Sequence, residues 1–313
     1  MQLSVVFTKP YCTTIRKLHL YLKWSLTIEM KIKLICSILA FLVSTPMLAG
    51  GGWTHKKKSG FIKISQWWVV SNQHYTGTGS INPNVTRGIF NSSLYAEYGI
   101  NDRLNAALYL PFFSRATRSD EFSSTGDLAV PGQAINSIGD TDVAIKYGFI
   151  QGKQFVLSGT ITLGLPLGIS NGGVDGALQT GDGEFNQMLS FDLSTSLPIG
   201  KVNTYYTLNT GFNNRTNGFS DEFRFGVEAG VTFFNKLTTA FRLYAVQSLN
   251  NGSSTVSNGI SIFSNNIEFT SFTTEIAYDV TQKFGFSANY GTAFSAKLIL
   301  ASPSYSFGVY MKF

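Results

Sequence analysis

Charged residues are scarce in this chain of 313 residues, since Asp, Glu, Lys and Arg make up only 13% of it. That is about half of their usual share in soluble domains. The chain is not strongly apolar either, with 43% hydrophobic residues, and beyond residue 49 no run approaches the ~20 apolar residues of a transmembrane helix. A helical membrane bundle is therefore excluded, and an ordinary soluble domain is not favoured. Glycine and phenylalanine are abundant instead, with 31 and 26 residues.

Cysteine is nearly absent as well, because Cys12 and Cys36 are its two occurrences and both lie near the N-terminus. The remainder of the chain therefore offers no disulfide, no thiolate nucleophile and no Cys-based metal site. The net charge of +6 is concentrated in the same region, since residues 1–49 hold six basic residues against Glu29, which leaves +1 for everything that follows. Nucleic acid is thus not an expected partner.

The N-terminal region has the layout of a secretory signal peptide. From Met30, two lysines precede the apolar run Leu34–Val43, and small residues follow up to Ala49. This run of 10 residues is too short to span a bilayer, so cleavage after Ala49 is expected, and a membrane anchor is the less favoured alternative. Residues 1–29 show no such pattern and are interpreted as an over-long gene start, which makes 30–49 the signal peptide.

The rest of the chain alternates apolar and polar residues with a period of two, which indicates amphipathic strands. In residues 155–165, for example, Phe, Leu and Ile fall on one face, whereas Val156 and small or hydroxylated residues fall on the other. Twelve segments share this pattern: 61–71, 89–99, 103–113, 140–150, 154–166, 185–197, 201–212, 221–233, 237–247, 267–279, 283–294 and 303–313.

Connections between these segments alternate strictly between long and short. The long ones fall near 72–88, 114–139, 167–184, 213–220, 248–266 and 295–302. A soluble β-sandwich gives no reason for this alternation, whereas outer-membrane barrels have short periplasmic turns, longer extracellular loops and an even number of strands. We therefore predict an all-β fold: a transmembrane antiparallel up-and-down β-barrel of about 12 strands, formed by residues 50–313 in the outer membrane of a Gram-negative bacterium.

The face opposite the apolar one should line the lumen of such a barrel. It carries mostly small polar residues, together with charges of both signs and several tyrosines. The candidate lumen-lining residues are Lys63, Glu97, Tyr109, Lys146, Asp192, Tyr205, Glu222, Arg224, Glu228, Arg242, Tyr244 and Glu275. Arg224 and Arg242 are placed to neutralise Glu222 and Glu228 across neighbouring strands. These charges either bias selectivity along a polar permeation path or form buried ion pairs that plug the barrel, and the sequence favours neither.

Motifs for catalysis or cofactor binding are scarce. After the signal peptide the chain holds only two histidines, His55 and His74, and no convincing Ser/His/Asp spacing. Neither an enzyme activity nor a cofactor is expected. Asp175, Asp182 and Glu184 are a candidate Ca²⁺ site, but their irregular spacing favours a solvated loop.

The middle of the chain resembles a known family. Three stretches follow one another in a familiar order: SIGDTDVAIKYGFI (137–150), LSGTITLGLPLG (157–168) and TGDGEFNQMLSFDLSTSLPIGKVNTYYTLNTGF (180–212). The match is carried by Gly139, Asp140, Lys146, Tyr147, Leu165, Pro166, Gly168, Thr180 and Gly181. This order is similar to that of the outer-membrane β-barrel family labelled for the meta-pathway of phenol degradation, a proposed transporter family.

The resemblance implies an outer-membrane barrel that passes small hydrophobic or aromatic molecules. Fatty-acid transporters with an N-terminal hatch are a more distant comparison, because the few residues Gly50–Gly60 before the first predicted strand are too short for a comparable plug. The expected function is a passive channel or uptake pore for small molecules. A non-conducting structural or surface-binding barrel is the alternative, and a secreted all-β binding domain comes third.

The C-terminal residues YSFGVYMKF alternate in the same way as the other segments. Their proposed lipid face holds Tyr305, Phe307, Val309, Met311 and Phe313. This strand is expected to close the barrel by pairing with the first strand near 61–70. Phe313 is interpreted as the signal that the outer-membrane assembly machinery recognises. The expected partners are therefore outer-membrane lipid, that machinery and a small-molecule permeant.

Overall fold

The computed structural model describes residues 51–200, 202–256 and 261–313. The predicted gene-start region and signal peptide (1–49) lie outside the described residues. Within the described ranges the regular elements are all β-strands. No helix in those ranges is long and apolar enough to cross a membrane.

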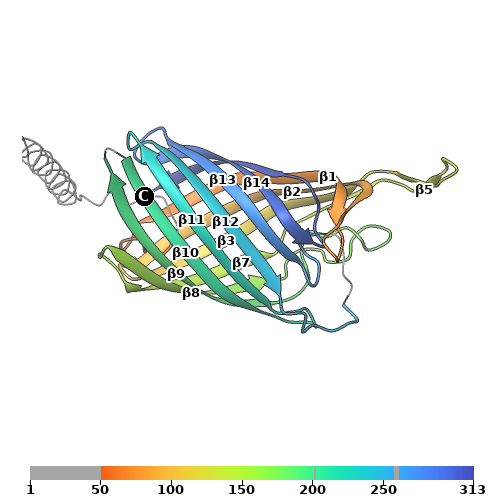
Figure 1. Cartoon of the computed structure of the whole chain (residues 1–313), viewed down its shortest axis with the longest axis horizontal. Coiled ribbons are helices and arrows are strands. Elements are labelled where there is room, and N and C mark those ends of the chain that lie inside the picture. The colour runs from red at the N-terminus through yellow and green to blue at the C-terminus, as the bar shows by residue number, and fades with distance from the viewer. Residues whose placement is uncertain (1–50, 201, 257–260) are drawn as a thin grey trace, which may run out of the picture. The chain divides into compact units, whose positions relative to one another are not determined.

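Twelve tilted strands form one antiparallel sheet that closes into a barrel (Figure 1). They are β1 (Gly60–Tyr75), β2 (Ile81–Asn101), β3 (Leu104–Arg118), β7 (Thr141–Ile150), β8 (Phe155–Leu165), β9 (Asn186–Ile199), β10 (Val202–Arg215), β11 (Glu222–Phe233), β12 (Leu237–Ser248), β13 (Glu268–Asp279), β14 (Phe284–Lys297) and β15 (Ser304–Lys312). Each predicted segment corresponds to one of these strands, so the predicted fold class is confirmed.

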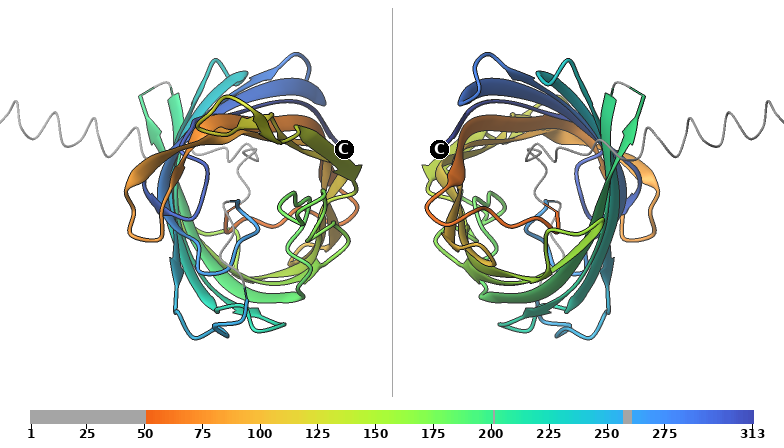
Figure 2. Two further views of the ribbon diagram at one scale, coloured as in Figure 1. Left: turned by 90° about the vertical axis from the view of Figure 1, so that its right-hand side faces the viewer. Right: turned by 90° about the vertical axis from the view of Figure 1, so that its left-hand side faces the viewer.

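The closing seam lies between the first and the last strand. β1 pairs with β15 in antiparallel register from Phe61↔Lys312 to Val69↔Ser304, as the C-terminal pattern predicted. Figure 2 shows the resulting ring of strands end-on. A closed ring satisfies the backbone hydrogen bonds of its strands without water and has no open edge, which is what a bilayer requires of a β-structure.

The alternation of residue types explains which side faces out. In β8 the side chain of Ile161 is 59% exposed on the outside, whereas Val156 and Ser158 point inward and are 2% and 0% exposed. The outer surface is a belt of exposed Phe, Leu, Ile and Val, and the inner side is rich in Ser, Thr and Asn. Apolar residues outside and polar residues inside are the reverse of the arrangement in a soluble protein, and they suit a barrel that is surrounded by lipid.

Several strands run past their predicted ends at the end of the barrel that carries the long connections. β1 continues to Tyr75 and β2 begins at Ile81, so the expected loop at 72–88 shrinks to residues 76–80. These extensions lie beyond the apolar belt. There the ladder of hydrogen bonds continues, but no lipid imposes an apolar face, so the hydropathy pattern could not reveal them.

The connection between β3 and β7 also contains short strands that the sequence did not indicate. β4 (Glu121–Phe122) and β5 (Leu128–Val130) form a hairpin that projects beyond the barrel (Figure 1). β6 (Gln133–Ser137) pairs with the C-terminal part of β3, and β7 pairs with its N-terminal part. Pro111 lies where β3 changes partner, a position at which a strand can lack one N–H donor.

Candidate functional site

The inner wall of the barrel combines small polar residues with tyrosines that lie over glycines. Tyr205 is paired with Gly230 of the next strand, and Tyr310 is paired with Gly285. A Cβ atom at either glycine would meet ring atoms of the facing tyrosine. The glycines therefore let the rings lie flat against the wall, which covers the glycine backbone and preserves space in the lumen.

All twelve predicted lumen residues belong to the inward side of their strands, the side that alternates with the exposed apolar residues. Most of them have a charged or polar partner there. The observed pairs are Glu97 with His55, Lys63 with Glu275, Arg242 with Glu228, Arg224 with Glu222, Lys146 with Gly51, Asp192 with Asn209, and Tyr205 with Glu228. Tyr109 is paired with Tyr95 across β2 and β3, and Tyr244 packs against an apolar cluster.

Four charged side chains form a chain of ion pairs along the middle of the lumen. Lys63 Nζ lies 3.0 Å from Glu275 Oε1, and Glu275 Oε2 lies 3.9 Å from Arg242 Nη2. Arg242 in turn donates from Nε to Glu228, which also accepts a 2.6 Å hydrogen bond from the Tyr205 hydroxyl. Two positive and two negative charges cancel, so the chain is electrostatically neutral as a unit.

Next to these ion pairs lies a cavity of ≈ 290 Å³. Trp67 of β1 and Tyr305 of β15 are the aromatic residues that line it, and Lys63, Arg242 and Glu275 are the charged ones. Small residues of β13, β14 and β15 form the wall between Trp67 and Arg242, among them Gly291 and Ser306. The cavity therefore combines aromatic rings, two cations with one carboxylate, and a wall of hydroxyl and amide groups.

The segment before β1 enters the lumen at the end with the short turns (Figure 2). Gly51 accepts a 3.0 Å hydrogen bond from Lys146 Nζ, and Trp53 meets Tyr205 edge-on with ring centroids 6.1 Å apart. A Cβ at Gly51 would come within 2.8 Å of inward-facing hydroxyl oxygens. Only a residue without a side chain fits so close to this wall.

The same segment then reaches β2, where His55 Nε2 lies 3.0 Å from Glu97 Oε2. Residues 51–55 thus run between the wall of β7, β9 and β10 and the wall of β2. The stretch is short, as the sequence indicated in comparison with an N-terminal hatch, and it nevertheless contacts both walls of the lumen. Lys56–Lys58, which follow it, are exposed.

At the opposite end, Arg215 holds together three carboxylates from three parts of the chain. Its guanidinium lies 3.1 Å from Asp182, 2.7 Å from Glu184 and 2.9 Å from Glu222. The side chains of Glu184 and Glu222 are 0% and 1% exposed. This cluster fixes the connection between β8 and β9 to the inner side of β10 and β11.

Two of the three acidic loop residues, Asp182 and Glu184, are largely shielded from solvent, in contrast to the favoured expectation of a solvated loop, whereas Asp175 is exposed as that expectation has it. Asp182 and Glu184 pair with Arg215, and Asp175 pairs with Arg118 of β3. Within the described residues no group of three or more His, Cys, Asp or Glu side chains is placed to hold a metal ion. The irregular spacing reflects a loop that spreads its carboxylates over several strands.

Arg215 and Arg118 were missed because the predicted strands stopped before them. Arg215 lies ten residues after Tyr205 on β10, so the same period of two places it inward. Extending the alternation of β10 past the apolar belt would have found Arg215. Arg118 would still have been missed, because Phe112 and Phe113 are both exposed and the inward set of β3 changes from odd to even numbers after Pro111.

Asp140, at the start of β7, ties the same loop down from another side. Its carboxylate accepts hydrogen bonds from the backbone N–H of Gly168 at 2.9 Å and of Asp182 at 2.7 Å. Burial, followed by the negative charge of Asp182, raises the pKa of Asp140 to about 7. The loop is thus held by an acid that titrates near neutral pH.

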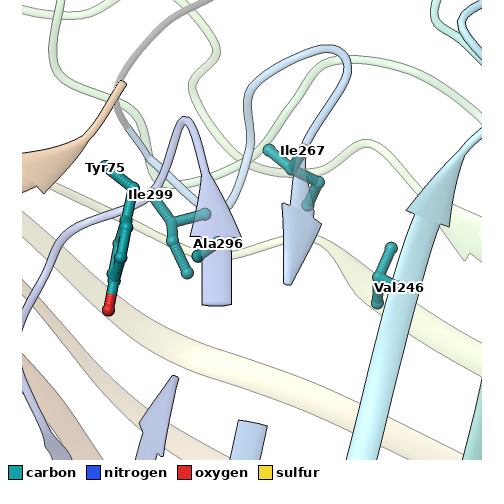
Figure 3. Packing of buried hydrophobic residues seen from close by; sticks show 5 residues of the cluster. All are labelled: Tyr75, Val246, Ile267, Ala296 and Ile299. Atoms are coloured by element: carbon teal, nitrogen blue, oxygen red, sulfur yellow. The ribbon is translucent and has the colours of Figure 1, made fainter. Parts of the chain in front are cut away.

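Apolar side chains from several strands and loops form buried clusters at this end (Figure 3). One buried cluster consists of Tyr75, Val246, Ile267, Ala296 and Ile299. A second brings Leu300 onto Val69 and Ile89, with Trp67 and Phe263 packed against them. The connections after β12 and β14 supply part of each cluster, so both ends of the lumen are narrowed, one by loops and the other by residues 51–55.

No protein-family model and no curated protein matches the sequence. Solved structures do match the fold. An outer membrane channel from Pseudomonas putida F1 has a TM-score of 0.58 at 14% identity, and the match covers 86% of this chain and 100% of that one. The β domain of the Bordetella autotransporter Brka has a TM-score of 0.50 at 12% identity, and covers 82% and 100%.

At such identities the likeness establishes the fold, that of a transmembrane β-barrel of the outer membrane, in agreement with the predicted location. Channels and autotransporter domains share this fold, so function has to be argued from the lumen. The resemblance to the phenol meta-pathway family finds no matching family model and stays an expectation.

Proposed function

We propose that this barrel is a passive channel for small molecules. The observation that carries the proposal is the space at the inner wall, a cavity of ≈ 290 Å³ beside the charged residues Lys63, Arg242 and Glu275. Barrels of about eight strands fill their interior with side chains, whereas twelve strands enclose more room. A barrel with a purely structural role has no need for charged groups that face an internal cavity.

The permeant that we propose is a small molecule with an apolar or aromatic part. Its support is the family resemblance of the middle of the chain and the aromatic side of the cavity at Trp67. A hydrophilic solute alone would gain nothing from this ring, because the surrounding wall already supplies hydroxyl and amide groups.

A non-conducting barrel is the second candidate, and the covered ends of the lumen favour it. Residues 51–55 cross one end, and the apolar clusters around Ile299 and Leu300 narrow the other. In that case the ion pairs would serve to fill the barrel, and the molecule would act through its projecting β4–β5 hairpin.

Single-channel recording in planar bilayers separates the two candidates. A channel gives reproducible current steps, and Arg242→Gln shifts the reversal potential in a salt gradient towards cation selectivity, because a lumen cation is lost. Arg115→Gln is the matched control, since Arg115 bonds Asn136 at the outer side of β3. The absence of current steps, together with liposomes that do not swell in small solutes, would favour the non-conducting barrel.

A further inference from the structure

The cavity between β1 and β12 is lined by two cations, Lys63 and Arg242, and by one carboxylate, Glu275, so its charged lining is positive by one. The side chain of Arg242 is 38% exposed, against 16% for Glu228 and 24% for Glu275. Glu228 is engaged on both oxygens, by Arg242 Nε and by the Tyr205 hydroxyl. Although the charges cancel in total, the group that a solute in the cavity meets first is the guanidinium.

The hydrogen bonding of Arg242 leaves the Nη1 and Nη2 groups of its guanidinium for a ligand. Its hydrogen bond to Glu228 uses Nε, and its Nη2 is 3.9 Å from Glu275 Oε2, which is beyond hydrogen-bond distance. A guanidinium presents two parallel N–H donors that match the two oxygens of a carboxylate. The edge that faces the cavity is thus suited to a carboxylate.

The opposite side of the cavity is aromatic and held in place. Trp67 packs against the cluster of Val69, Ile89 and Leu300, which fixes its ring. Between Trp67 and Arg242 the wall consists of small residues whose side chains project little into the cavity. At Gly291 there is no room for a larger residue, because a Cβ atom would meet the Ser304 hydroxyl at 3.0 Å. A flat ring can therefore lie along this wall with one face or edge on Trp67.

The size of the cavity suits a small ligand, such as one with a single ring. Pockets for drug-sized ligands measure about 300–1,000 Å³, and ≈ 290 Å³ lies at the lower limit. We propose that the cavity binds a single-ring carboxylate, with its carboxylate on Arg242 and its ring beside Trp67. As a statement about what the channel selects, this rests on the proposed function, whereas binding itself is measured without transport.

Equilibrium dialysis of the detergent-purified barrel with radiolabelled benzoate at neutral pH tests the proposal. Benzyl alcohol keeps the ring without the charge, and acetate keeps the charge without the ring. We expect saturable binding of benzoate, and at least about tenfold weaker binding of both others, because each lacks one of the two contacts. Equal affinity for benzyl alcohol or acetate overturns the corresponding half of the proposal, and no benzoate binding overturns all of it.

Variants of one ion pair give effects of opposite sign. Arg242→Gln should weaken benzoate binding at least about tenfold, since it removes the charged hydrogen bonds. Glu228→Gln should tighten it, because a carboxylate that competes for Arg242 becomes neutral. A merely structural pair would lose affinity in both variants, and that outcome overturns the proposal.

Folding of each variant is checked by heat-modifiable gel migration. If Arg242→Gln does not fold, the double variant Arg242→Gln/Glu228→Gln takes its place, because it leaves no charge unpaired, and undiminished benzoate binding by it overturns the proposal. Arg115→Gln is the control and should bind benzoate as the wild type does. Current steps without benzoate binding would overturn the carboxylate site and leave the channel standing. Benzoate binding without current steps would do the reverse.

Discussion

At the scale of single residues, the pairing of tyrosine with glycine places aromatic rings against the inner wall of the barrel. The ring of Tyr205 occupies the space that a side chain at Gly230 would need, and its hydroxyl reaches Glu228 at 2.6 Å. We expect Gly230→Val to displace this ring and to lower the free energy of unfolding by about 1–3 kcal/mol, the usual cost of overpacking. Urea unfolding in lipid vesicles measures it.

The control for this prediction is the same substitution in a Tyr205→Ala background. With the ring absent, valine meets no obstacle and suits a strand, so the cost should disappear. An equal loss of unfolding free energy in both backgrounds would mean that the backbone conformation, and not the Tyr205 ring, disfavours a side chain at residue 230.

Two neighbouring residues of β10 test the assignment of the two faces. Leu208 is 55% exposed on the outer belt, whereas Asn209 faces inward and donates a 2.8 Å hydrogen bond to Asp192. Leu208→Arg should cost about 2–4 kcal/mol of unfolding free energy, because it puts a charge into lipid. Asn209→Arg should fold nearly normally and alter conductance. Similar folding defects in both variants would contradict the inside–outside assignment.

At the scale of elements, the connection between β8 and β9 depends on pH. The pKa of Asp140 is raised from 3.8 to about 7 by burial and by Asp182. A raised pKa means that the folded protein holds the proton more tightly than the unfolded chain does. The stabilisation is therefore full below about pH 4 and is lost as the pH rises through about 7.

Hydrogen exchange of the amides in 166–185, corrected for intrinsic exchange rates, should show less protection at pH 8 than at pH 5. Asp140→Asn is the control, because it cannot ionise, and its protection should vary little with pH apart from any contribution of Glu184. A pH dependence as steep as that of the wild type in this variant would assign the effect to another group.

The closing seam offers a second test at this scale. Phe313 exchanges backbone hydrogen bonds of 2.9 and 3.1 Å with Gly60, and its ring stacks on Tyr98 at 6.5 Å between centroids. We propose that this exposed terminal ring is also the assembly signal. Deletion of Phe313 should lower the amount of barrel in the outer membrane, measured by blotting, whereas Phe313→Tyr should not. Normal membrane levels of the deletion variant would argue against the signal.

The strands could be predicted from the sequence because the surrounding lipid imposes the same residue pattern on each of them. Each strand must show an apolar residue to the bilayer at every second position, as Leu208 and Ile161 do, so the pattern is written into the chain. The loops obey no such rule. The period of two places Arg215 on the inner face of β10, but no pattern in the sequence indicates that its partners are Asp182 and Glu184 of the loop.

The lumen was predictable in its membership but not in its contacts. A period of two says that Lys63 and Glu275 both face inward, yet β14 and β15 lie between their strands. Lys63 can extend over β15 and β14 to Glu275 because the inward residues of those two strands are small. The contact therefore depends on the strand register and on the size of the side chains in between. The cavity at Trp67 and the path of residues 51–55 follow from the same kind of long-range fit.

At the scale of the whole molecule, the barrel is a rigid wall with separate obstructions at its two ends. Residues 51–55 carry no part of the hydrogen-bonded ladder of the wall. They are anchored by Lys146, Glu97 and the ring of Tyr205, together with hydrogen bonds to Gln151, Ser194 and Asp102. Loosening them should widen one end of the lumen without unfolding the barrel. The wall and the opening are thus independent features.

The double variant Trp53→Ala/Lys146→Met removes two of these anchors. We expect its single-channel conductance to rise severalfold, while heat-modifiable migration stays that of the folded barrel, because the twelve-stranded ladder is untouched. Lys57→Met is the matched control, since Lys57 is exposed outside the lumen. Unchanged conductance in the double variant would show that the apolar clusters at the other end, rather than this segment, limit the current through the molecule.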